Sequence, residues 1–138
     1  MKPALAFALA LLLVPGSAQA QRISGPAVAI DGDTLDMTGF RVRLFGIDAV
    51  EAGQTCARGG EAWACGEAAR ALLGELVSGE TVECEPKGRD GEGTLLAVCR
   101  AGRVDLAAAM AGAGFAVRLD DPEGAYLAAV DTAKAQAA

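Results

Sequence analysis

The chain has 138 residues, which favours a single domain, and 12 Lys and Arg stand against 18 Asp and Glu, a formal net charge of −6. An acidic chain lacks the broad basic face of tight polyanion binders, although a local basic groove remains compatible with it. The chain contains no histidine, which excludes Ser-His and Cys-His catalysis, so hydrolysis would have to use carboxylates, arginines or a metal.

The start of the chain has the pattern of a secretory signal peptide. Lys2 is positive, residues 4–14 are apolar, and Ala18-Gln19-Ala20 has the small residues of a cleavage site. The apolar run is much shorter than the roughly 20 residues of a membrane span. We therefore expect a signal peptide over residues 1–20 and a secreted or periplasmic domain, not held in a membrane, over residues 21–138.

Three short strands are expected next, over residues 27–30, 34–37 and 41–45. Thr38-Gly39 predicts a hairpin turn between the second and the third strand. In the third strand, Val42 and Leu44 alternate with Arg41 and Arg43, which places the two arginines on one face.

A helix is expected over residues 61–77, ending at Ser78-Gly79. It would have an apolar stripe at helical spacing, formed by Ala64, Ala68, Leu72, Leu73 and Leu76. Two more strands, residues 81–85 and 95–100, should form a hairpin. Its glycine-rich tip, residues 87–93, lacks the Gly-Lys-Ser/Thr ending of a phosphate-binding loop.

Two further helices are expected near the end of the chain. Asp105 predicts the N-cap of a short helix over residues 106–111, and Asp121-Pro122-Glu123 predicts the start of a last helix running toward Lys134. Five strands with a helix between the third and the fourth is the order of a small OB-type barrel. We therefore expect an α+β fold, a five-stranded OB-fold Greek-key β-barrel with about three helices.

An exported chain would carry its four cysteines in an oxidising compartment, where disulfides persist. Cys56, Cys65, Cys84 and Cys99 allow three pairings, and their spacing alone does not choose between them. Zinc is the weaker alternative, because no two cysteines are two to four residues apart. Since Cys84 and Cys99 lie on strands expected to pair, and Cys56 and Cys65 flank one short loop, we expect the disulfides Cys56–Cys65 and Cys84–Cys99.

The tetrapeptide DGDT, residues 31–34, opens the second expected strand. Asp48 and Glu51 follow the third strand, so a tight barrel would bring Asp33, Asp48 and Glu51 close to Arg43. Calcium binds carboxylates, carbonyls and waters, a free carboxylate can activate water, and an arginine can stabilise a phosphoryl group. The alternative is an ordinary turn with solvated surface charges, since Asp and Gly are also typical of turns.

Three motifs occur in the order AIDGDT, RVRLFGIDAVE and LAAAMAGAGFAV. Together they resemble the thermonuclease (staphylococcal-nuclease-like) family, and the resemblance extends over nearly all of the expected mature chain. It implies an OB fold and a calcium-dependent nuclease that hydrolyses nucleic-acid phosphodiester bonds. It also implies a role for each matching residue: Asp33, Asp48 and the backbone carbonyl of Ala49 as Ca²⁺ ligands, Glu51 as general base and Arg43 as a catalytic arginine, with Asp31 a turn residue.

The resemblance weakens on the substrate side of this site. Where the family usually has Asp-x-Tyr-Gly-Arg, the chain has Asp90-Gly91-Glu92-Gly93-Thr94. Thr94 thus replaces the second catalytic arginine, Glu92 replaces a nucleotide-contacting tyrosine, and Leu119 stands for another substrate-side tyrosine. A threonine cannot supply a charged bidentate donor to a phosphate. Arg89 is the nearby basic residue that could substitute if it reaches the site.

Two hypotheses follow. In the first, the chain is a secreted calcium-dependent phosphodiesterase acting on nucleic acid, DNA or RNA, with reduced activity. In the second, it is a catalytically inactive OB-fold module that serves in binding or interaction. The residue at position 94 distinguishes the two hypotheses, because an active enzyme would need another basic residue to do the work of the missing arginine. In either case we expect a monomer.

Overall fold

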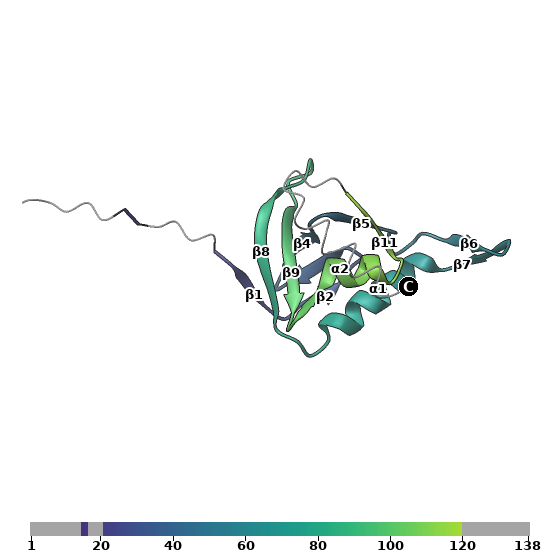
Figure 1. The fold of residues 1–138 in the computed structure, drawn as a ribbon, viewed down its shortest axis with the longest axis horizontal. Helices are drawn as coiled ribbons and strands as arrows, with labels where there is room; N and C mark the ends of the chain where they lie inside the picture. Colours follow the sequence, from purple (N-terminus) through teal and green to yellow (C-terminus); the bar gives the residue numbers. More distant parts are fainter. Residues whose placement is uncertain (1–14, 17–20, 120–138) are drawn as a thin grey trace, which may run out of the picture.

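The computed structural model describes residues 15–16 and 21–119 (Figure 1). Within these residues the chain forms two helices and eleven mostly short strands. The helices are α1 (Cys65–Val77) and α2 (Leu106–Gly112). The strands are β1 (Ile23–Gly25), β2 (Val28–Ala29), β3 (Thr34–Met37), β4 (Phe40–Leu44), β5 (Ile47–Ala49), β6 (Cys56–Arg58), β7 (Glu61–Trp63), β8 (Val82–Arg89), β9 (Leu95–Ala101), β10 (Val104–Asp105) and β11 (Ala116–Arg118).

The main sheet has the order β1-β8-β9-β4-β3-β2, with β10 also paired to β9. Its neighbouring strands are antiparallel except for β4 and β9, which are parallel. Two small sheets accompany it: β5 pairs with β11, and β6 with β7 in a hairpin that projects from the rest of the molecule (Figure 1). The expected α+β, OB-like fold is confirmed, although the strand pairing of the described residues leaves the barrel open.

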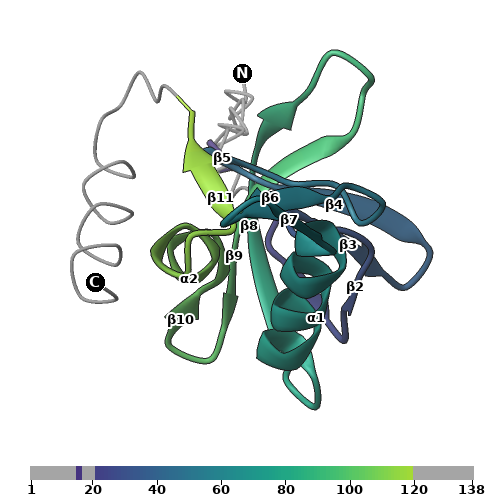
Figure 2. The ribbon, with the colours of Figure 1, turned by 90° about the vertical axis from the view of Figure 1, so that its right-hand side faces the viewer.

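The core lies between the main sheet and the helices, with α1 against β2, α2 against β9 and the two helices in contact (Figure 2). Burial of apolar surface is the main force that holds these layers together. The largest buried side chains come from both layers: Leu35, Met37, Val42, Leu44, Ile47, Leu73, Leu106 and Met110. The predicted alternation in β4 is confirmed, because Val42 and Leu44 are buried whereas Arg41 is exposed and Arg43 only half-buried.

Several local predictions are confirmed. Thr38 and Gly39 form the β3–β4 turn with φ of 54° and 95°, the left-handed pair that a tight hairpin requires. Asp105 caps α2, where its carboxylate accepts a hydrogen bond from the backbone N–H of Ala108.

The predicted start of the first helix is wrong. Residues 61–63 form β7 instead, and the helix begins at Cys65. A turn through Gly59 and Gly60, both with positive φ, pairs β7 with β6. The ring of Trp63 also packs under the guanidinium of Arg58, 4.3 Å from the ring centroid, which favours the hairpin over a helical turn.

The predicted apolar stripe of this helix is only partly right. Leu73 is buried as expected, and Leu72 and Leu76 pack half-buried against the core. Ala64 is exposed, however, and the fully buried apolar positions besides Leu73 are Cys65, Ala69 and Val77, which the stripe did not include. The expected last helix, running toward Lys134, lies outside the described residues.

The two disulfides are those expected from the sequence. Cys84 and Cys99 are directly opposite one another on β8 and β9, and their bridge is buried in the core. Cys56–Cys65 joins β6 to the first turn of α1. Among the described residues, no helix is long and apolar enough to cross a membrane.

Each disulfide should stabilise the fold measurably. Cys84 and Cys99 are 15 residues apart, and a closed loop of that length is worth about 3 kcal/mol through the entropy of the unfolded chain. We expect the C84A/C99A variant to lose at least this much free energy of unfolding in urea titrations. C56A/C65A, which opens a nine-residue separation, should lose slightly less. Identical unfolding curves for reduced and oxidised wild-type protein would contradict both expectations.

Candidate active site

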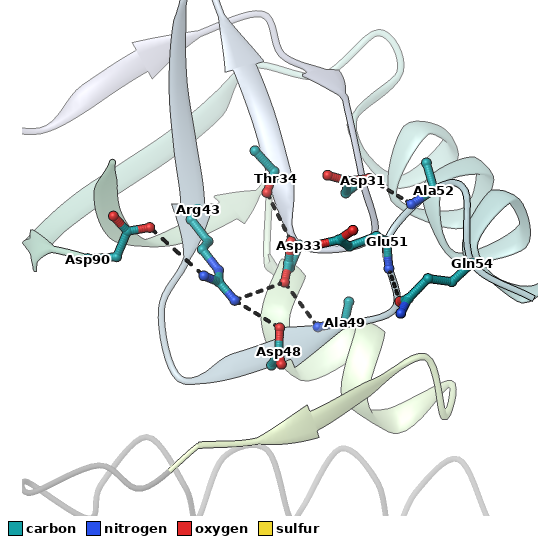
Figure 3. Close-up of polar contacts among 10 residues, drawn as sticks. All are labelled: Asp31, Asp33, Thr34, Arg43, Asp48, Ala49, Glu51, Ala52, Gln54 and Asp90. Carbon is teal, nitrogen blue, oxygen red and sulfur yellow. Dashed lines mark hydrogen bonds and ion pairs between the residues drawn. The ribbon is translucent and has the colours of Figure 1, made fainter. Parts of the chain in front are cut away.

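Arg43, on β4, points into a group of carboxylates (Figure 3). Its Nη2 donates a hydrogen bond to Oδ1 of Asp48 at 2.8 Å and lies 3.7 Å from Oδ2 of Asp33. Its Nη1 lies 3.9 Å from Oδ2 of Asp90. One guanidinium therefore faces three carboxylates from three segments of the chain, and the cluster keeps an excess of negative charge.

Asp33 is the one buried charged residue among those described, with 6% of its surface exposed. Its Oδ1 accepts a hydrogen bond from the hydroxyl of Thr34 at 2.9 Å, and its Oδ2 accepts one from the backbone N–H of Ala49 at 3.0 Å. Its backbone carbonyl accepts from the N–H of Leu44 at 2.8 Å. These bonds compensate for burial of the charge and tie the DGDT turn to β4 and β5.

Gly32 is required because the DGDT backbone passes close to two other elements. A Cβ at this position would lie 2.8 Å from Cβ of Ala69 on α1 and 3.0 Å from Cβ of Ala49 on β5. Real Cβ atoms do not approach so closely. The glycine in this motif therefore serves close packing, and that packing sets the position of Asp33.

Asp31 has a role that the sequence did not reveal. It belongs to the turn, as expected, in which the N–H of Ile30 donates to the carbonyl of Thr34 at 2.8 Å. In addition, its Oδ1 accepts a hydrogen bond at 2.7 Å from the N–H of Ala52, 21 residues later. Asp31 therefore holds the loop that carries Glu51, and no local pattern signals a contact over that separation.

The Glu51 loop is held against the start of α1. The N–H of Glu51 donates to Oε1 of Gln54, and the N–H of Gly66 donates to the carbonyl of Gln54 at 3.1 Å. A Cβ at Gly66 would lie only 1.8 Å from the carbonyl oxygen of Glu51, so only glycine allows this approach. The Cys56–Cys65 disulfide also links the chain just after this loop to the start of α1.

All five residues proposed for the site, Asp33, Arg43, Asp48, Ala49 and Glu51, line one pocket of about 260 Å³. The Glu51 side chain points into this pocket, toward Asp33 (Figure 3). The remaining lining residues are Asp31, Thr34, Arg41, Asp90, Glu92 and Thr94. Six carboxylates and two arginines thus share a small space, and the sequence had not pointed to Asp90 as a partner of Arg43.

The donor chemistry of this pocket fits calcium, a hard cation that binds oxygen ligands. Asp33 and Asp48 approach one another around the same Arg43 nitrogen, and the lining carboxylates outnumber the arginines by four. Within the described part of the chain, no group of three or more His, Cys, Asp or Glu side chains is arranged to hold a metal ion. Because calcium takes six to eight oxygen ligands, a cation held by these two carboxylates would also need backbone carbonyls and waters.

Arg89 does not reach this pocket. Its Nη1 donates to the carbonyl of Gly93 at 2.8 Å, which holds the guanidinium against its own hairpin. It lines a neighbouring pocket of about 540 Å³ instead. Thr94 lines both pockets, and so does Arg41.

An OB-like sheet with an arginine and carboxylates gathered at one pocket is the arrangement expected of a nuclease-type domain. A family model described as staphylococcal nuclease homologue matches residues 41–138, and the chain belongs to this family. The chain is also 39% identical over 134 residues to the succinoglycan biosynthesis protein ExoI of Rhizobium meliloti (strain 1021), a match that covers 94% of this chain and 70% of that protein. The family match begins after DGDT and therefore does not itself include Asp33.

The close approaches at Gly32 and Gly66 should make both positions intolerant of a methyl group. We expect Gly32→Ala and Gly66→Ala each to lower the free energy of unfolding by about 1–3 kcal/mol, as overpacked sites do. Gly74→Ala is the matched control, because Gly74 also lies in α1 but a Cβ there would be in ordinary contact, 3.9 Å from Cβ of Ala29 on β2. It should leave stability unchanged or raise it by up to about 1 kcal/mol. Equal denaturation midpoints for all three variants would contradict the packing argument.

Proposed function

We propose that the chain is a calcium-dependent phosphodiesterase that hydrolyses DNA or RNA. The observation that carries the proposal is the shared pocket in which Arg43 and Glu51 lie beside Asp33 and Asp48. Membership of the staphylococcal nuclease homologue family supports nucleic acid as the substrate class. In this proposal residues 1–20 are a cleaved signal peptide and residues 21–138 form one monomeric domain. Two disulfides are compatible with a secreted or periplasmic location.

Each residue has a distinct role in the proposed reaction. Asp33, Asp48 and the carbonyl of Ala49 would hold Ca²⁺, which supplies positive charge to the phosphate oxygens when bound. Arg43 stabilises the negative charge that develops on those oxygens in the transition state. Glu51 accepts the proton of the attacking water, a role supported by its exposed carboxylate at the pocket.

The second candidate is a calcium-binding module without catalytic activity. It is favoured by the lining of the pocket, where Glu92 and Asp90 add negative charge and Thr94 offers no positive charge. Removing the proposed leader takes away Lys2 and leaves 11 basic against 18 acidic residues, or −7. Such a charge opposes the approach of a polyanion.

Calcium binding can be tested without measuring activity. A ligand at 100 times its Kd stabilises a protein by about 2.7 kcal/mol, which for a domain of this size raises Tm by on the order of 10 °C. We expect calcium to produce such a rise in the mature protein and Asp33→Ala to abolish it. Because Asp33 is buried, the exposed Asp48→Ala serves as a second variant. Glu80→Ala, which removes an exposed carboxylate that does not line the pocket, should keep the full rise.

Catalysis is tested at Glu51. Replacement by Gln keeps the size and the backbone hydrogen bonds of this residue but removes its ability to accept a proton. We expect kcat on a labelled single-stranded oligonucleotide to fall by about 10²–10⁴-fold, while the calcium-dependent rise in Tm persists. A wild-type protein that binds calcium but cleaves neither DNA nor RNA would make the binding module the better interpretation.

A further inference from the structure

We infer that Arg41 supplies the second guanidinium to the substrate phosphate, in place of the family arginine that Thr94 replaces. This inference rests on the proposed function, since it concerns the same pocket. Arg41 and Arg43 are two positions apart on β4, so their side chains leave the same face of the strand. Both line the pocket that also holds Asp33, Asp48 and Glu51, called the acidic pocket below.

The strand register places Arg41 next to Thr94, the position at which the family has its arginine. β4 and β9 pair in parallel, with Val42 opposite Leu95 and Arg43 opposite Leu96. Arg41 comes one residue before Val42 on β4, and Thr94 comes one residue before Leu95 on β9, so the same register sets Arg41 beside Thr94. Arg41, Thr94 and Glu92 line both the acidic pocket and its larger neighbour, so they lie where the two pockets meet. The side chain of Arg41 therefore leaves β4 beside Thr94, the position of the family arginine.

Arg41 is also available for a ligand. Its side chain is exposed, and it makes no hydrogen bond or ion pair with any residue in the described ranges. Asp36, its cross-strand neighbour on β3, accepts a hydrogen bond from the N–H of Gly39 instead. By contrast, Arg43 is surrounded by three carboxylates and Arg89 is bonded to the carbonyl of Gly93. Arg41 can therefore contact a phosphate without first breaking a bond within the protein.

The chemistry of the proposed contact requires arginine. A planar guanidinium can donate two parallel N–H bonds to two phosphate oxygens, whereas an ammonium acts as a point charge. Such a contact strengthens as charge develops on the phosphoryl group, so its loss should appear mainly in kcat. Arg41 would also offset the carboxylate of Glu92 at the pocket boundary.

The first experiment compares kcat on one labelled single-stranded oligonucleotide with calcium present. We expect Arg41→Ala to lower kcat by on the order of 10³-fold, the size of an arginine contribution to phosphoryl transfer, and Arg41→Lys to recover only part of it. Arg89→Ala, which removes the neighbouring guanidinium, should have no effect. Thr94→Arg should restore most of the activity of Arg41→Ala but increase that of the wild type far less, because both arginines would serve one phosphate.

The second experiment measures binding, so that it does not depend on hydrolysis. In the Glu51→Gln background with calcium, the affinity for the same oligonucleotide is measured by fluorescence anisotropy over a range of salt concentrations. Loss of one phosphate contact on a single strand should reduce the slope of log K against log salt by about 0.7. Arg41→Ala should show this reduction and Arg89→Ala should not.

The outcomes separate this inference from the proposed function. An Arg41→Ala variant with unchanged kcat and unchanged salt slope would overturn the role of Arg41. Equal gains from Thr94→Arg in the wild type and in Arg41→Ala would do the same, because the second guanidinium would then be absent from the natural protein. If the wild type cleaves no nucleic acid, the proposed function fails, and the salt slope alone decides whether Arg41 contacts phosphate.

Discussion

The site depends on the narrow passage of Gly32 between Ala69 of α1 and Ala49 of β5. Because the backbone passes there without a side chain, the aspartates on either side can reach the end of β5 and the loop that follows it. Asp33 accepts a hydrogen bond from the N–H of Ala49, and Asp31 accepts one from the N–H of Ala52. The DGDT turn thus fixes the segment from which Asp48 and Glu51 project, and the helix fixes the turn.

The electrostatics of the pocket follow from this close packing. Backbone constraints bring six carboxylates together, and Arg43 alone compensates three of them. Such a pocket attracts a cation and repels a phosphate, so a nucleic-acid substrate requires every positive charge that the protein can direct there. Thr94 stands where the resemblance implies an arginine, and in an acidic chain that change would be large. This is why the proposal assigns a role to the guanidinium of Arg41, which also lines the pocket.

The loop of Glu51 is stabilised from a second direction. The β6–β7 hairpin returns the chain to α1 through Cys56–Cys65, and Gly66 then allows the helix to approach the carbonyl of Glu51. Exposed loops are usually mobile, whereas the role of proton acceptor proposed for Glu51 requires a defined position. The bridge and the glycine together supply that position.

Local patterns determined much of this protein, because they depend only on residues close in the chain. They predicted the alternation that buries Val42, the turn at Thr38 and the cap at Asp105. The motifs DGDT and RVRLFGIDAVE also contained the five residues proposed for the site, all of which line the pocket. Only the tertiary structure decided the start of α1, the bond from Ala52 to Asp31 and the fact that Arg41 lines the pocket whereas Arg89 does not. Each of these depends on contacts between segments distant in sequence, where a disulfide, a close backbone approach or a strand register overrides local preference.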